Sequence, residues 1–363
     1  MIDFKPILQS NQENKQKLDL SKLTKPRTSQ QRLRDAFDQP PIKKLVGEIW
    51  LRGELHILFA DTGVGKSILA VTIGNSLSKG EQVLFLENEL EPLNVLYYDF
   101  ELSDRQFLHR YSNEKEECFG FSEHFFIDTI DFVELDKACN GLSFENALLK
   151  KIRNDIEVLG IDILILDNLS YLKTQTTQST ECALELMRAL NELKKEYQIS
   201  ILVLAHTPKV EISSPLTINS IAGSKHISNF ADSVSAIGKS VQGSNIRYIK
   251  QVKPSRSAEM VYDSENVITC ELNKEDSFLT FKFIGFDNEK SHLRQPIGDD
   301  ERNEMDEKAY ELSKQGKSYA EIAETLLGDP KKKGTICKWI KRYNVSKVSN
   351  PNNGNDGNDD IPF

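Results

Sequence analysis

The sequence predicts an α/β protein built on a mainly parallel sheet, followed by a small all-helical unit. Between residues 42 and 286, short apolar runs alternate with helical patterns, which is typical of a parallel sheet covered by helices on both faces. The first strong apolar run leads into a glycine-containing loop and then a helix. Beyond residue 303, helical patterns follow one another without a strand between them.

The composition is that of a soluble globular chain. Of its 363 residues, 39% are apolar and 28% are charged, which fits two domains or one large domain with appendages. The formal net charge is −9, so contact with nucleic acid must rely on local basic patches. No stretch has the length and hydropathy of a membrane span, and the N-terminal residues lack the order of a signal peptide. The five scattered cysteines indicate reduced thiols in a cytoplasmic protein, with neither a disulfide framework nor a zinc site.

Changes in composition divide the chain into predicted segments. The first is a disordered polar arm with at most a short helix around residues 30–37. The α/β domain is followed by a charged linker, a helical domain and a disordered acidic tail. The predicted boundaries are 1–41 for the arm, 42–286 for the α/β domain, 287–303 for the linker, 304–347 for the helical domain and 348–363 for the tail.

Inside the α/β domain, the local patterns predict individual strands and helices. The predicted strands span residues 54–59, 94–100, 125–129, 162–166, 200–204, 233–237, 246–251, 267–272 and 278–283. The predicted helices span residues 66–77, 103–110, 144–158 and 182–197. Little helical sequence separates the last strands, so we expect them to extend one edge of the sheet in antiparallel fashion.

The loop after the first of these strands has the pattern of a phosphate-binding loop. Its residues are Ala60, Asp61, Thr62, Gly63, Val64, Gly65, Lys66 and Ser67. The two glycines allow consecutive N–H groups to converge on an anion. Lys66 is expected to reach the β- and γ-phosphates of ATP, and the Ser67 hydroxyl to bind Mg²⁺. Ala60 replaces the usual glycine but is small enough to leave the loop intact. The alternative is an ordinary glycine-rich turn.

Polar residues end three other predicted strands, at the sheet edge where ligands of open α/β sheets bind. Asp167 is the expected second-sphere acid for Mg²⁺, although a core strand can also simply end in an acid. Glu101 is the expected base that orients the attacking water, or else an acid that starts a helix. His206 is expected to sense the γ-phosphate and to pass its state to the long polar loop 208–224, or else only ends its strand.

The phosphate loop, Glu101, Asp167 and the segment 204–209 together resemble the RecA-fold ATPases. The resemblance is to the branch with the hexameric replicative helicases of mobilisable plasmids and the DnaB type, and it covers about residues 42–286. It implies a RecA-like P-loop NTPase fold, Mg²⁺ and ATP bound between subunits of a homo-oligomeric ring such as a hexamer, and single-stranded DNA bound by that ring. Glu101 after the second strand, and Asn168 rather than an acid after Asp167, fit this branch.

In that family a neighbouring subunit supplies a basic finger to the ATP. Lys253 and Arg256 match it by position, and the alternative is a solvated basic hairpin. A loop formed by residues 222–226 and Asn229 is the candidate for the channel face, with Lys225 on DNA phosphates.

The predicted helical domain has the pattern of a helix-turn-helix that binds duplex DNA. A capping box begins with Ser318, and a third helix spans residues 335–343. Lysines at 331–333, 338 and 341 with Arg342 suit phosphate contacts, and Thr335 with Lys338 could approach base edges. The alternative is a protein-interaction module.

The last three residues are Ile361, Pro362 and Phe363, preceded by acids. This end resembles the acidic tip of bacterial single-stranded-DNA-binding proteins, which implies a contact with host replication or repair proteins. The alternative is an inert tail.

These features together predict a Mg²⁺-ATP-dependent ATPase that acts on DNA. The leading expectation is a hexameric, helicase-like protein for the replication or mobilisation of a bacterial mobile element. The first alternative is an ATP-switched DNA-binding regulator or loader without unwinding activity. The second is a non-hydrolysing adaptor that binds replication proteins through its tip.

Overall fold

The computed structural model describes residues 26–349, apart from residue 116 and the segments 131–133, 135–136, 138–143, 169–180, 208–210, 222–223 and 295–298. The first 25 residues of the predicted arm and the tip Ile361–Phe363 therefore lie outside the described residues. No helix among the described residues is long and apolar enough to cross a membrane.

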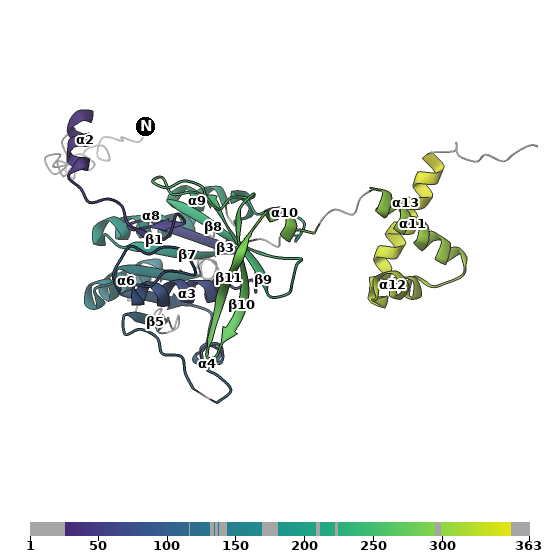
Figure 1. The fold of residues 1–363 in the computed structure, drawn as a ribbon, viewed down its shortest axis with the longest axis horizontal. Coiled ribbons are helices and arrows are strands. Elements are labelled where there is room, and N and C mark those ends of the chain that lie inside the picture. The colour runs from purple at the N-terminus through teal and green to yellow at the C-terminus, as the bar shows by residue number, and fades with distance from the viewer. Residues whose placement is uncertain are drawn as a thin grey trace, which may run out of the picture.

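A nine-stranded sheet forms the centre of the protein, with the strand order β11-β10-β9-β8-β3-β7-β6-β4-β5 (Figure 1). Its strands are β3 (Leu55–Ala60), β4 (Val95–Asp99), β5 (Phe125–Thr129), β6 (Ile163–Asp167), β7 (Ser200–His206), β8 (Ser233–Lys239), β9 (Ile246–Lys253), β10 (Val267–Glu275) and β11 (Phe278–Asp287). The strands from β5 to β8 in this order pair in parallel, and β9, β10 and β11 continue the sheet in antiparallel fashion. The predicted α/β fold, with a mainly parallel sheet and an antiparallel edge, is confirmed.

The register of the parallel strands brings their carboxyl ends level. Ala60 at the end of β3 pairs with His206 on β7, and Asp99 on β4 pairs with Asp167 on β6. A one-residue shift would turn these side chains to the other face of the sheet. The register therefore places the strand-end residues at a common edge.

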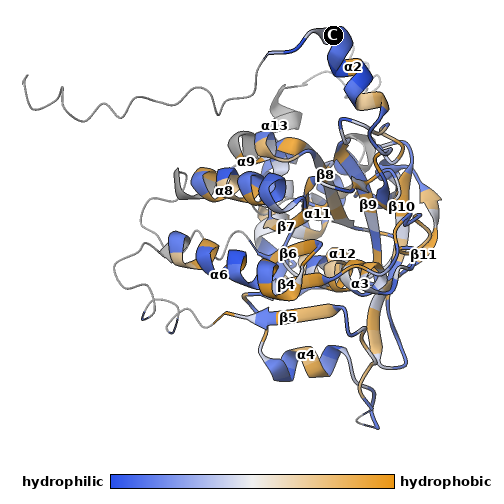
Figure 2. Ribbon diagram, turned by 90° about the vertical axis from the view of Figure 1, so that its left-hand side faces the viewer, coloured by the Kyte–Doolittle hydropathy of each residue, from blue (hydrophilic) through white to orange (hydrophobic). Residues whose placement is uncertain are grey.

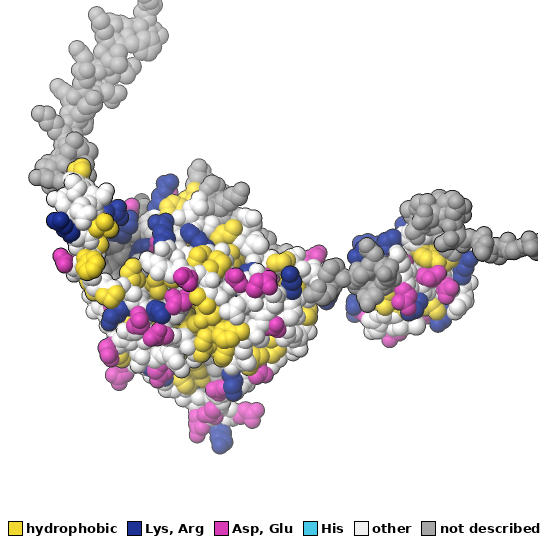
Figure 3. Space-filling model, turned by 45° about the horizontal axis from the view of Figure 1, so that its top comes forward, with side chains coloured by type: hydrophobic (Ala, Val, Ile, Leu, Met, Phe, Trp, Pro, Cys, Tyr) yellow, Lys and Arg dark blue, Asp and Glu magenta, His cyan; other side chains and the backbone are white. Residues whose placement is uncertain are grey.

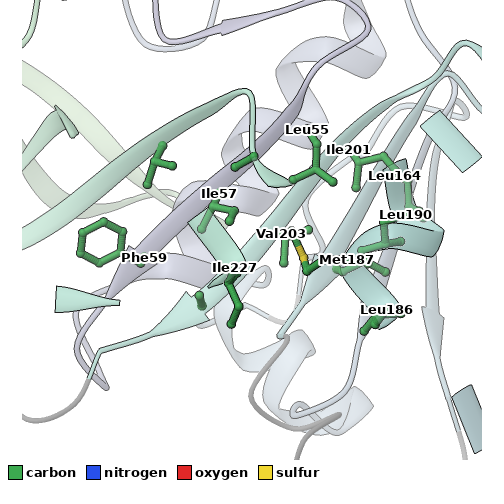
Figure 4. Close-up of a cluster of buried hydrophobic side chains, with 14 of the residues drawn as sticks. Leu55, Ile57, Phe59, Leu164, Leu186, Met187, Leu190, Ile201, Val203 and Ile227 are labelled. Carbon is green, nitrogen blue, oxygen red and sulfur yellow. The ribbon is translucent and has the colours of Figure 1, made fainter. Parts of the chain in front are cut away.

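Helices cover both faces of the sheet, which explains why the parallel strands are almost wholly apolar. One face is covered by α6 (Phe144–Leu159), α8 (Glu181–Tyr197) and α9 (Ser224–Phe230), and Figure 4 shows Leu186, Met187 and Leu190 packed on it. Figure 2 shows orange apolar colour along the strands and both colours on α6 and α8, as expected for helices with one buried side.

The other face is covered by α3 (Lys66–Lys79), which follows the phosphate loop. This helix is buried along nearly its whole length, because the sheet lies on one side of it and β11 packs on another. Gly74 on α3 lies against Phe125 and Ile165, where a Cβ atom would lie 2.7 Å from the Phe125 ring. The small residue thus sets how closely α3 approaches the sheet.

The remaining elements include some that were not predicted. A two-stranded sheet of β1 (Lys44–Val46) and β2 (Trp50–Leu51) precedes β3. The expectation of a loop at 222–229 is wrong for its described part, because Ser224–Phe230 is helical and packs Ile227 into the core. The short helix expected near residue 30 is α2 (Ser29–Phe37), which begins with a capping box between Thr28 and Gln31.

The described residues after 287 are mainly helical. The predicted linker contains α10 (Glu289–His292), whose Glu289 and His292 are buried, and the first turn of α11 (Asp299–Lys314). Helices α12 (Tyr319–Leu327) and α13 (Lys333–Ser349) follow, joined by a short 3-10 turn η3 (Pro330–Lys332). The three helices α11, α12 and α13 share a core of their own, made of Ala309, Ile322, Ala323, Ile336 and Ile340. The capping box at Ser318 is present, with the Ser318 N–H donating to Glu321 at 2.8 Å.

Candidate active site

The phosphate loop connects β3 to α3 at the common edge of the sheet. Gly63 and Gly65 have φ angles of 70° and 113°, in the region that favours glycine. Gly65 is also close to the Phe281 ring, which would lie 2.9 Å from a Cβ atom at that position. Any larger residue there would be strained and crowded. The loop therefore needs Gly65 for its backbone and for its packing, which the sequence motif alone does not reveal.

Lys66, the first residue of α3, is buried and only 6% exposed. Its ammonium group donates to the carbonyl oxygens of Ala60 at 3.1 Å and Asp61 at 3.3 Å, and lies 3.0 Å from His206 Nδ1. Burial lowers the pKa of Lys66, while the carboxylates of Asp167, Glu101 and Asp61 act in the opposite direction. This is a desolvated cation held at the loop by two backbone carbonyl groups, with the His206 ring beside it.

Asp167 ends β6 and is 1% exposed. The Tyr97 hydroxyl donates to its Oδ2 at 2.5 Å, whereas Oδ1 is buried with no hydrogen-bond partner among the described residues. Burial raises the pKa of Asp167 to about 6, and hydrogen bonds from Ser67 and Tyr97 oppose this shift. A hydroxyl beside a buried carboxylate oxygen that lacks a partner is a donor set that suits Mg²⁺. Ser67 and Asp167 thus fit the metal that the motif implies.

Glu101 follows β4, and its position is set by Asp99. The Asp99 carboxylate accepts the N–H groups of Glu101 and Leu102, both at 2.9 Å, so Asp99 shapes the turn rather than facing a ligand. The Asn168 side chain donates to Glu101 Oε1, and His206 Nε2 lies 3.5 Å from the same oxygen. The hydrogen bond from His206 is the main cause that lowers the pKa of Glu101, with a further contribution from Asn168. These contacts thus keep the carboxylate ionised and fix its position.

Asn168 completes a chain of contacts across the site. Its side-chain nitrogen lies 2.9 Å from His206 Nε2 as well as bonding Glu101. Contacts thus run from Lys66 through His206 and Asn168 to Glu101. The structure brings these residues together from α3, β7 and the ends of β6 and β4. From the sequence, Asn168 was noted only because an asparagine, and not an acid, follows Asp167. Its position between Glu101 and His206 follows from the register of β6 and β7.

Lys253 and Arg256 lie at the opposite end of the sheet. Lys253 pairs with Val234 at the start of β8, and its ammonium group donates to the carbonyl oxygens of Ser228 at 3.1 Å and Ala231 at 2.6 Å. Arg256 follows β9 and is exposed. Neither residue can reach the phosphate loop of its own chain, so the predicted role as a finger requires a neighbouring subunit.

Sequence reasoning missed Arg247, which contacts the phosphate loop from β9. Its Nε donates to the Val64 carbonyl oxygen at 2.8 Å. No motif marks this arginine, because it comes from an antiparallel strand far along the chain. Only the pairing of β9 with β8 brings it to the loop.

The basic residues of the C-terminal helices differ in what they contact. Arg342 forms a bidentate ion pair with Asp306, so it connects α13 to α11 and is not available as an unpaired basic side chain. Thr335, Lys338 and Lys341 are exposed on α13.

Comparison with known proteins identifies the larger part of the chain. The sequence profile of the AAA domain family matches residues 21–211, which is more than half of the chain. No curated protein matches the sequence of this chain. Among solved structures, a KaiC-like protein from the hyperthermophilic archaeon Pyrococcus horikoshii OT3 is similar, with 13% sequence identity and a TM-score of 0.46. That match covers 67% of this chain and 100% of the other.

Proposed function

This chain belongs to the AAA domain family, and from that membership and the geometry of its site we propose that it is a Mg²⁺-dependent ATPase that acts on DNA. The observation that carries the proposal is the chain of contacts that joins Lys66, His206, Asn168 and Glu101 at the phosphate loop. It links the cation expected at the triphosphate with the carboxylate expected to activate water.

In the proposed reaction, each residue has one task. Lys66 leaves the carbonyl groups it now contacts and binds the β- and γ-phosphates, while the N–H groups of the loop hold the phosphates. The Ser67 hydroxyl would bind Mg²⁺ and Asp167 would hold a water ligand of the metal, which when bound would supply positive charge to the phosphate oxygens. Glu101 accepts a proton from the attacking water.

The same contacts suit His206 as a sensor. Its Nδ1 faces Lys66 and its Nε2 faces Asn168, so movement of Lys66 to a phosphate removes one of its partners. His206 directly precedes the long loop that begins after β7. The state of the nucleotide can thus reach that loop through the strand end.

Under this proposal, the ATP site is complete only when a second subunit supplies basic residues to it. Lys253 and Arg256 are too far from their own phosphate loop and are assigned to the site of a neighbouring subunit in a ring. There they stabilise charge that develops on the γ-phosphate.

Contact with DNA is assigned to the ring and to the C-terminal helices. On the face shown in Figure 3, basic and acidic side chains are interspersed, so no single basic surface covers that side. The exposed Thr335, Lys338 and Lys341 of α13 are the proposed duplex contacts. The tip Ile361–Phe363 is the proposed contact with replication or repair proteins.

The possible uses of ATP are separated by ATP turnover, by strand displacement and by binding that depends on the tail. ATP turnover is measured with and without single-stranded DNA, together with displacement of a labelled strand. Turnover stimulated by DNA together with displacement supports the helicase, and turnover without displacement supports a regulator or loader. Absence of turnover with intact tail-dependent binding would leave only the adaptor and contradict the proposed ATPase.

A further inference from the structure

Arg247 lies at the start of β9 and reaches across to the phosphate loop. Its side chain is buried, with the whole residue only 7% exposed. Nε donates to the Val64 carbonyl oxygen at 2.8 Å. Nη1 donates to the carbonyl oxygens of Ser244 at 2.9 Å and Ile246 at 2.8 Å, which fixes the plane of the guanidinium. The bond to Val64 therefore comes from a rigidly held donor.

The carbonyl that Arg247 holds belongs to the peptide between Val64 and Gly65. In a planar trans peptide the C=O and N–H groups point in opposite directions. A donor fixed on the Val64 oxygen therefore turns the Gly65 N–H to the other side of the peptide plane. Gly65 has a φ of 113°, and a glycine has other backbone conformations open to it. The hydrogen bond from Arg247 thus favours one orientation of this peptide.

The electrostatic setting of Arg247 is unlike that of a structural arginine. Burial lowers its pKa, and no charged group counteracts that effect. No salt bridge to Arg247 is found in the described part of the chain. A buried cation of this kind adds little to the stability of the empty protein, because its desolvation is not offset by a carboxylate. It does add positive potential beside a loop that is expected to hold phosphates.

We infer that Arg247 is a positioning residue for the phosphate loop: by holding the Val64 carbonyl, it directs the Gly65 N–H toward the phosphates of a bound nucleotide. This inference rests on the proposed nucleotide-binding function. The backbone N–H groups of such loops cradle the α- and β-phosphates. Loss of Arg247 should therefore lower the binding affinities for ATP and ADP by a similar factor.

The test uses the full chain and the variants Arg247→Met and Arg247→Lys. Dissociation constants for MgATP and MgADP are measured by titration calorimetry, and the unfolding midpoint is measured without nucleotide. We expect Arg247→Met to raise the dissociation constants of both nucleotides about tenfold, which corresponds to about 1.4 kcal/mol. The unfolding midpoint without nucleotide should not change. Arg247→Lys keeps one donor and should recover part of the affinity.

Arg52 provides the matched control at the opposite end of the sheet. It also donates to a backbone carbonyl, that of Asp162 at 3.1 Å, and pairs with the Asp162 carboxylate at 2.8 Å. Arg52→Met should leave both nucleotide affinities as in the wild type. The inference is overturned if Arg247→Met binds ADP as the wild type does, or if it only lowers the nucleotide-free midpoint. A wild-type chain that binds neither nucleotide would instead overturn the proposed function, so the wild-type titration separates the two failures.

Discussion

Two pairs of basic residues, one at each end of the parallel strands, differ in the groups that they contact. At the carboxyl end, Lys66 and Arg247 are buried cations that donate to backbone carbonyl oxygens, and Asp167 keeps one buried oxygen without a partner among the described residues. At the amino end, Arg52 pairs with Asp162, and Lys194 pairs with Asp232. A buried charge that no direct ion pair offsets is costly, and strongly perturbed charged groups cluster at functional sites. The comparison assigns ligand binding to the carboxyl end and fold stability to the amino end.

The largest expected effect is that of a substitution of Glu101 at the carboxyl end. Glu101→Gln keeps the size and the hydrogen bond from Asn168 but removes the charge that is proposed to accept a proton. We expect kcat for ATP hydrolysis to fall by about 10²–10⁴, with nucleotide affinity retained. Single-turnover hydrolysis and nucleotide titration measure the two effects. Asp104→Asn, an exposed acid three residues later in the first turn of α4 (Asp104–Arg110), serves as the control. Normal hydrolysis by Glu101→Gln would show that the base is another residue.

A second change tests the amino end. Lys194 is buried and bonds to Asp232, whose carboxylate also accepts the Leu55 N–H at 2.9 Å. Lys194→Met leaves that carboxylate without its cation, so the free energy of unfolding should fall by about 2–3 kcal/mol. Nucleotide affinity should not change. Urea unfolding checks the first result, with the exposed neighbour Lys195→Met as the control. Unchanged stability together with weaker nucleotide binding would reverse the roles assigned to the two ends.

The smallest expected effect concerns Glu54, also at the amino end. Its carboxylate is buried and bonded by Leu51, Ser233 and Ser255, and burial raises its pKa above 4.5. A raised pKa means that the stabilising contribution of Glu54 is complete below about 4.5 and is lost as the pH rises through the folded-state value.

Glu54→Gln is neutral at every pH and should therefore gain stability relative to the wild type as the pH rises, by about 1 kcal/mol or less. The measurement is the free energy of unfolding of both proteins at pH 5 and pH 8. A difference that does not vary with pH would show that Glu54 ionises as freely in the folded chain as in the unfolded one.

The sequence predicted most of the fold because hydrophobic periodicity and strand-end chemistry are local. Strands such as β5 and helices such as α6 were placed within a few residues of their observed bounds, and Glu101, Asp167 and His206 were placed at one edge by the rule for parallel sheets. The roles of these residues remain predictions. The short strands β1 and β2 and the helix α9 have no strong periodic pattern of their own, so they were not predicted.

Contacts within the site depend on register and could not be predicted. Asn168 reaches both Glu101 and His206 only because β6 lies between β4 and β7. Arg247 reaches the phosphate loop only because β9 turns back along β8. Likewise, the sequence presents Arg342 as a free basic residue, whereas its partner Asp306 lies on another helix.

The most direct test of the central claim is the dissociation constant of MgATP for the wild type, Lys66→Ala and Lys79→Ala. Both lysines belong to α3, but Lys66 begins the helix at the loop and Lys79 ends it. We predict that the wild type and Lys79→Ala bind alike, and that Lys66→Ala binds at least about 100-fold more weakly, a loss of about 2.7 kcal/mol. Equal binding by wild type and Lys66→Ala would contradict the assignment of the nucleotide to the carboxyl end of the sheet.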